Sequence, residues 1–221
     1  MKKKNGFFTA SGFLAAFAMW TAAVRLIDVQ TIGPQGTSVG FAAMNRFVHE
    51  ATGVHFSLYE ITDWLGLVPV AVAMGFALLG FFQWFRRKRL HRVDYSLLVL
   101  GGFYLVVMAV YLLFEAVIIN YRPVLINGVP EASYPSSTTM LVLCVMPTAV
   151  MQVRSRIRNA AWRRWVSVAA VGFTGFMVVG RLLSGVHWMS DIVGGVLLST
   201  GLVLLYYMVI GLKKETSPPK Q

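Results

Sequence analysis

The chain has 221 residues, of which 57% are hydrophobic and only 13% are charged, and its formal net charge is +11. Long apolar runs in such a composition are typical of a polytopic membrane protein and exclude an ordinary soluble domain. The single cysteine excludes a disulfide framework and a thiolate metal cluster.

Six apolar runs are long enough to cross a hydrocarbon layer of about 30 Å as helices. They lie at about 7–26, 64–85, 95–119, 138–153, 166–183 and 192–212. The lysines before the first run resemble the start of a secretory signal, but five further runs favour a retained first helix. We predict an all-α integral membrane fold of six transmembrane helices, with one domain over 1–212 and a disordered cytoplasmic tail over 213–221.

The cations are distributed unevenly between the two ends of these spans. Sixteen of the twenty Lys and Arg residues fall within 2–4, 86–92, 154–164 and 213–220, at alternate span ends. By the positive-inside rule these ends and both termini face the cytoplasm. This placement explains the net charge without a nucleic-acid partner. The outer side keeps four arginines, Arg25, Arg46, Arg122 and Arg181.

The outer segment between the first two spans begins with loop chemistry at residues 31–37. Apolar residues then recur at helical spacing from Phe41 to Ala51, while Asn45 and other polar residues take the opposite face. We expect a helix here. It could lie in the membrane interface or pack as a lid on the span ends.

The stretch Arg181-Leu-Leu-Ser-Gly-Val-His187-Trp-Met-Ser-Asp191 places a cation, an imidazole and a carboxylate where a span meets water. Such groups are expensive near hydrocarbon. If a helix begins after Ser184, His187 and Asp191 share one of its faces and the carboxylate can orient the ring. Taken singly, the arginine could be an interfacial residue and the aspartate a helix cap.

The outer loop between the third and fourth apolar runs supplies further groups that could bind the same anion. Arg122 adds a second guanidinium, and Ser136-Ser137-Thr138 adds hydroxyl groups and backbone N–H donors. Guanidinium groups and the N-terminus of a helix both bind anions well. The convergence of these residues predicts a phosphate site that opens outward.

The motifs Arg122-Pro123, Pro135-Ser136 and Arg181-x5-His187-x3-Asp191 occur in an order that resembles the type-2 phosphatidic acid phosphatase family. These membrane lipid phosphatases are related to the vanadium haloperoxidases and form six-helix bundles. The resemblance rests on residues 115–191, and the helix count fits along the whole chain.

The resemblance implies a role for each matched residue. His187 would attack phosphorus to form a phosphohistidine, and Asp191 would hold its ring. Arg122 and Arg181 would bind the non-bridging oxygens, and Ser136-Ser137-Thr138 would complete the phosphate cradle. A neutral imidazole is a competent nucleophile at neutral pH, which agrees with this assignment.

Three positions depart from the family pattern. Glu115 stands where the first motif has lysine, Thr138 replaces the histidine that protonates the leaving group, and Gly180 replaces a serine. Glu115 could form an ion pair that positions Arg122, could act as the missing acid if burial raises its pKa, or could mark a site that no longer hydrolyses.

We therefore expect a metal-independent lipid phosphatase without cofactors, in a plasma membrane that the family and the short chain indicate is bacterial. Candidate substrates are phosphatidic acid, phosphatidylglycerol phosphate and undecaprenyl pyrophosphate. Because a departing phosphate needs less protonation than an alkoxide, the lost acid favours the pyrophosphate. The alternative is a catalytically silent relative that binds phosphorylated lipids or headgroups, whereas a transporter fits the charge distribution less well.

Overall fold

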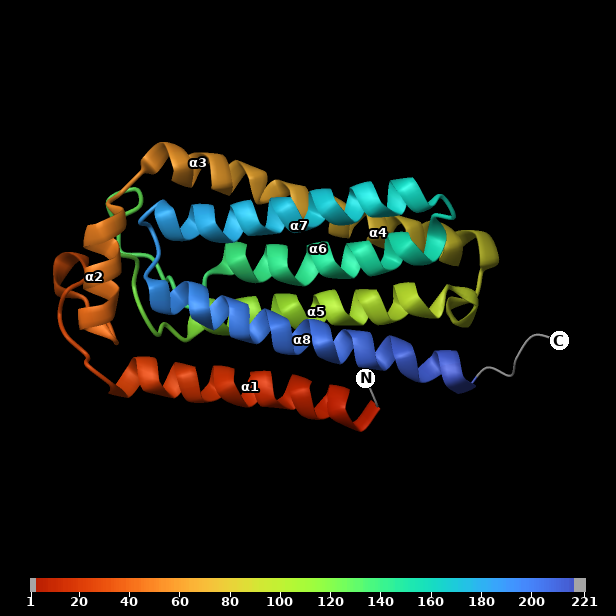
Figure 1. The fold of residues 1–221 in the computed structure, drawn as a ribbon, viewed down its shortest axis with the longest axis horizontal. Coiled ribbons are helices and arrows are strands. Elements are labelled where there is room, and N and C mark those ends of the chain that lie inside the picture. Colours follow the sequence, from red (N-terminus) through yellow and green to blue (C-terminus); the bar gives the residue numbers. More distant parts are fainter. Residues whose placement is uncertain (1–2, 217–221) are drawn as a thin grey trace.

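The computed structural model describes residues 3–216, which form a bundle of long helices that run side by side (Figure 1). The helices are α1 (Lys3–Leu26), α2 (Ala42–Thr52), α3 (Phe56–Leu65), α4 (Leu67–Arg87), α5 (Tyr95–Ala116), α6 (Ser137–Arg156), α7 (Ala160–Leu183) and α8 (Met189–Thr216). Two short 3-10 turns, η1 (Pro34–Gly36) and η2 (Leu90–Arg92), lie in the connections. Six segments are long and apolar enough to cross a membrane, which confirms the predicted six-helix membrane fold.

The second span differs from its prediction. It begins at Phe56 and consists of two helices, α3 and α4, that meet at Gly66. A β-carbon at Gly66 would lie 2.8 Å from the carbonyl oxygen of Asp63, so the close turn between the helices requires glycine. Polar residues such as Glu60 and Asp63 interrupt the apolar run of α3, which is why hydropathy alone did not predict this helix.

At the C-terminus, α8 continues through residues 213–216, which we had assigned to the tail. The remaining tail residues, 217–221, lie outside the described residues.

Helix α2 lies across one end of the bundle (Figure 1), as expected for a lid on the span ends. Its buried face differs from the one predicted. Asn45 is fully buried, whereas Phe47 is 73% exposed. The reason is a polar contact, since the side-chain amide of Asn45 donates to Ser190 Oγ (2.9 Å) and accepts from the Ser190 N–H (3.1 Å) at the start of α8.

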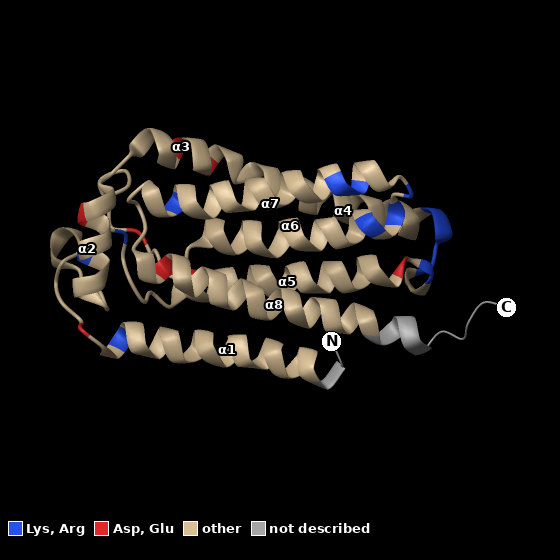
Figure 2. Ribbon diagram, viewed as in Figure 1, with Lys and Arg blue, Asp and Glu red and all other residues tan. Residues whose placement is uncertain are grey.

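Most of the described cations gather at the end of the bundle opposite α2 (Figure 2). The cations of residues 86–92 lie around the connection between α4 and α5, and those of residues 154–164 lie around the connection between α6 and α7. Four arginines lie toward the α2 end instead: Arg25, Arg46, Arg122 and Arg181. The cations of residues 2–4 and 213–220 lie outside the described side chains. The bundle thus has one strongly basic end and one end with few cations.

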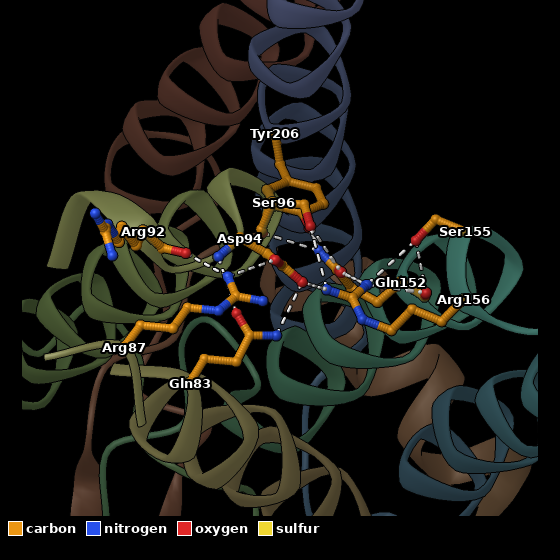
Figure 3. Close-up of polar contacts among 9 residues, drawn as sticks. All are labelled: Gln83, Arg87, Arg92, Asp94, Ser96, Gln152, Ser155, Arg156 and Tyr206. Carbon is orange, nitrogen blue, oxygen red and sulfur yellow. Dashed lines mark hydrogen bonds and ion pairs between the residues drawn. The ribbon is translucent and has the colours of Figure 1, made fainter. Parts of the chain in front are cut away.

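A polar network closes the basic end (Figure 3). The side-chain amide of Gln152 is 1% exposed and donates to Tyr206 Oη (2.6 Å) and to the Ser96 carbonyl (2.9 Å). Arg156 donates to Gln152 Oε1 and lies 3.7 Å from Asp94 Oδ2. The Gln83 amide donates to Asp94 (2.9 Å) and, with the nearby arginines, lowers the pKa of that carboxyl. The network joins α4, α5, α6 and α8 at this end.

Between the two ends, apolar side chains of α5, α6 and α8 form the core of the bundle. Leu100, Phe103, Met140 and Leu198 pack there beside Cys144, which is fully buried. The cysteine is thus a core residue of α6.

Candidate active site

Two arginines converge on one nitrogen of His187. Nη1 of Arg122 and Nη2 of Arg181 each lie 3.2 Å from Nε2 of the ring. Because a guanidinium nitrogen can only donate, this contact requires a lone pair on Nε2 and places the ring proton on Nδ1. The structure therefore brings together three of the residues that the sequence singled out, with Nε2 of the ring facing both cations.

His187 lies in a short turn before α8 begins at Met189, so the expectation that it shares a helix face with Asp191 is wrong. The two residues are neighbours all the same, since Nδ1 of the ring is 3.7 Å from Oδ2 of the carboxylate. That separation is too long for a hydrogen bond, although the carboxylate lies on the side of the ring that carries the proton. Oδ2 accepts a hydrogen bond from the Trp188 N–H (3.0 Å), so Asp191 also caps the start of α8.

The environment of His187 favours its neutral form. The residue is 3% exposed, and burial is the largest cause that lowers the pKa of its ring. The charges of Arg122 and Arg181 lower it further, so the pKa lies well below its usual range. The ring is thus neutral at neutral pH, as a nucleophile must be.

Arg122 is held by Glu131, which we did not predict. Its Nε lies 3.1 Å from Glu131 Oε2, and its backbone N–H donates to the Glu131 carbonyl (2.9 Å). Helix α5 ends at Ala116, so Glu115 and Arg122 do not share a helix face, and the carboxylate that pairs with Arg122 is that of Glu131 rather than Glu115, which was one of three alternatives.

The contact between Arg122 and Glu131 arises from a small hairpin. Isolated antiparallel bridges pair Tyr121 with Ala132 and Ile126 with Val129. The turn is Asn127-Gly128, where both residues have positive φ, 51° and 78°. An Asn-Gly pair between apolar residues is a strong sequence signal for such a turn, and it could have revealed the hairpin.

Arg181 is held by α3. The side chain is 1% exposed, and its Nη1 lies 3.4 Å from Thr62 Oγ1 and 3.5 Å from Asp63 Oδ1. The guanidinium also lies over the ring of Tyr59, 4.9 Å from its centroid, in a cation–π contact. A β-carbon at Gly180 would lie 2.9 Å from the methyl group of Thr62, so the glycine that departs from the family pattern is what lets α3 come this close.

A small pocket lies beside His187 at the start of α6. Its lining includes Glu115, Ser137 and Tyr134 together with His187. The predicted residue Ser136 immediately precedes the helix. Its Oγ is buried without a hydrogen-bond partner, and its N–H donates to the Asp191 carbonyl (3.1 Å).

Thr138 is not among the residues that line this pocket, although we expected it to bind phosphate. Its methyl group faces the α3–α4 turn, where a β-carbon at Gly66 would lie 3.7 Å from it. Of the three hydroxyl residues, Ser137 is the one that the structure brings to the pocket with His187.

Two buried asparagines support Asp191 from outside the motifs. Asn120 Nδ2 lies 3.2 Å from Asp191 Oδ1 and 3.3 Å from Ser190 Oγ. Asn45 binds the same serine, and its Nδ2 also donates to the Gly40 carbonyl (2.8 Å). Neither role could be predicted from the sequence, because an asparagine in a loop or on a polar helix face gives no distinctive signal.

Known proteins match both the motif region and the fold. Residues 117–215 match the PAP2 superfamily. The crystal structure of a transmembrane PAP2 type phosphatidylglycerolphosphate phosphatase from Bacillus subtilis resembles the whole bundle, with a TM-score of 0.63 at 19% sequence identity over 96% of this chain and 98% of that chain. No curated protein matches the sequence. Residues 117–215 thus match the PAP2 superfamily and the fold around them resembles that of a PAP2 type phosphatase, which supports the family resemblance that the three motifs predicted.

Proposed function

We propose that the protein is a membrane lipid phosphatase whose nucleophile is Nε2 of His187. The observation that carries this proposal is the convergence of Arg122 and Arg181 on that nitrogen, each at 3.2 Å. Two guanidinium groups beside one neutral, nucleophilic imidazole form a site for a tetrahedral dianion.

In the proposed reaction, the phosphate of the lipid enters between His187 and the two arginines. Its non-bridging oxygens replace Nε2 as acceptors of the guanidinium N–H groups. The freed lone pair attacks phosphorus, the bond from phosphorus to the lipid oxygen breaks, and the lipid leaves with the bonding electrons. Water then attacks the phosphohistidine and releases phosphate. The arginines stabilise the charge on the transferring group in both steps, so this scheme requires no metal.

The departing oxygen must be protonated or must tolerate a negative charge. Thr138 occupies the position of the family's acid, and a threonine hydroxyl is too weak an acid to replace a histidine. Glu115 lines the same pocket as His187, but this residue is exposed, so the burial expected of a carboxyl that acts as the missing acid is absent. A lipid pyrophosphate, such as undecaprenyl pyrophosphate, has the least basic leaving group and is the substrate class that we favour.

We infer that the site faces the outside of a bacterial plasma membrane. Support comes from the separation of the basic end of the bundle from the end that holds His187 (Figure 2), because basic ends face the cytoplasm. The substrate would then be hydrolysed in the outer leaflet.

The test is phosphate release by the purified protein in detergent with a chelator present. Phosphatidic acid, phosphatidylglycerol phosphate and undecaprenyl pyrophosphate are compared, with His187→Ala as the inactive variant and His91→Ala, at the basic end, as the matched control. We expect release that His187→Ala abolishes and His91→Ala leaves unchanged, fastest on the pyrophosphate. Faster turnover of phosphatidic acid would contradict the substrate assignment. Binding of these lipids without any release would contradict the phosphatase and identify a silent relative.

A further inference from the structure

An apolar groove lies between α4 and α5, in the half of the bundle near the basic end. It encloses about 220 Å³. Its lining is almost entirely apolar and includes Phe81 and Trp84 from α4 and Leu97 from α5. Phe81 and Trp84 are 52% and 47% exposed and belong to a membrane-spanning segment, so the groove opens toward lipid.

Two glycines create the width of the groove. Gly80 of α4 and Gly101 of α5 both line it, and a β-carbon at either position would have no other atom within 4 Å. The space therefore exists because side chains are missing on both helices. Apolar surface in such a groove is covered in a membrane by hydrocarbon, and an extended acyl chain has the shape to fill it.

The basic turn between α4 and α5 lies at the mouth of this groove. Leu90 of η2 lines the groove, and Arg89 and Arg92 lie on either side of Leu90 in the sequence. Both arginines are exposed, and among the side chains that the structure describes, those of residues 5–211, no carboxylate forms an ion pair with either of them. The mouth thus offers uncompensated positive charge directly beside the apolar cavity.

The neighbouring Arg87 is different, because its charge is already compensated. It lies 3.2 Å from Asp94 Oδ1 and also donates to the Arg92 carbonyl. Figure 3 shows the Arg92 guanidinium pointing away from Asp94, outside the network. Arg87 therefore fixes the turn, which leaves Arg92 available to bind a ligand.

We propose that this groove binds an anionic phospholipid, with one acyl chain between Gly80 and Gly101 and the headgroup phosphate on Arg89 and Arg92. The apolar cavity suits the acyl chain of such a lipid, and the arginines at its mouth suit the negatively charged phosphate. Basic residues beside a membrane also attract anionic headgroups. This site is at the opposite end of the bundle from His187, and the proposal is independent of the proposed enzymatic reaction.

Trp84 makes the site observable, because bromine atoms on an acyl chain quench the fluorescence of a nearby indole. The intact protein is reconstituted in phosphatidylcholine bilayers that contain a small fraction of brominated phosphatidylglycerol or brominated phosphatidylcholine. The Trp84 signal is the difference between the protein and its Trp84→Phe variant. We expect half-maximal quenching at an at least about fivefold lower fraction of phosphatidylglycerol than of phosphatidylcholine.

Double variants, each with a matched control, test the apolar groove and its basic mouth separately. Gly80→Leu with Gly101→Leu fills the groove and should remove the preference for phosphatidylglycerol. Gly75→Leu with Gly102→Leu is the matched control, because those glycines also face open space but do not line the groove.

For the mouth, Arg89→Gln with Arg92→Gln should make the two lipids quench equally. Arg163→Gln with Arg164→Gln, in the first turns of α7 at the same basic end, should leave the preference intact. Equal quenching by the two lipids in the unchanged protein would overturn the proposal, as would an undiminished preference after the groove is filled.

Discussion

The methyl group of Thr62 occupies the space next to Gly180, where a β-carbon would lie only 2.9 Å away. Thr62 belongs to α3, and Gly180 precedes Arg181 in α7. This approach allows Thr62 and Asp63 to reach the Arg181 guanidinium, at 3.4 and 3.5 Å. Thus the glycine at the position of the family's serine makes room for α3, the helix that holds Arg181.

Gly180→Ser should therefore impair the proposed phosphatase activity, even though serine is the residue that the family pattern has at this position. The added atoms must displace α3 or Arg181, and overpacking of this kind typically costs about 1–3 kcal/mol. We expect kcat/KM to fall by roughly tenfold or more and the Tm to fall with it. Gly175→Ser in the same helix is the control, since a β-carbon there has no other atom within 4 Å. Equal activity of the two variants would contradict this explanation of Gly180.

Glu131→Gln tests whether the hairpin positions Arg122. The variant keeps the size of the side chain but removes the charge that lies 3.1 Å from Arg122 Nε. We expect kcat/KM to fall by about tenfold, which corresponds to about 1.4 kcal/mol. The corresponding change at Arg181, Asp63→Asn, should cost less, because that pair is longer at 3.5 Å and the carboxylate is 59% exposed. A larger fall of kcat/KM in Asp63→Asn than in Glu131→Gln would contradict this prediction.

The sequence predicts those features of the fold and the site that depend on neighbouring residues, and it does not predict those that depend on contacts between distant segments. Apolar runs and basic links are local patterns, so the six spans and the asymmetry of charge could be predicted. The spacing of Arg181, His187 and Asp191 likewise identified the centre of the site. The residues that hold this centre, such as Glu131 and Asn45, act through contacts between distant segments. No local pattern marks them, apart from the Asn-Gly turn that forms the hairpin.

Asn120→Ala tests the support of Asp191. The change removes the N–H donor to Asp191 Oδ1 and leaves a buried acceptor with fewer partners, which typically costs about 1–3 kcal/mol. For a chain of this size each kcal/mol lowers the Tm by roughly 2–4 °C. We expect a lower Tm and slower turnover, measured by thermal unfolding in detergent and by phosphate release. Asn5→Ala, at an exposed position in α1, should change neither quantity. An unchanged Tm in Asn120→Ala would show that the amide cluster is dispensable.

The pH dependence of turnover should report the charge around His187. A protonated ring has no lone pair for attack, so kcat/KM falls as the pH drops through the pKa of His187. Burial and the two arginines lower that pKa, so this acidic limb should lie below the usual histidine value of about 6.5. Arg122→Gln removes one of the positive charges and should raise the pKa, which moves the limb to higher pH.

The comparison between variants removes the effect of the substrate's own ionisation, because the substrate is the same in each profile. Arg122→Gln should also lower kcat by about 10²- to 10³-fold, as the loss of a transition-state donor does in other enzymes. Arg46→Gln is the matched control, since this arginine lies at the same end of the bundle and donates to Gln30 rather than to His187. If Arg122→Gln lowered kcat without moving the acidic limb, the titrating group would be the substrate or another residue. Only a shift of the limb in Arg122→Gln, absent from Arg46→Gln, would identify His187 as the group whose protonation stops the reaction.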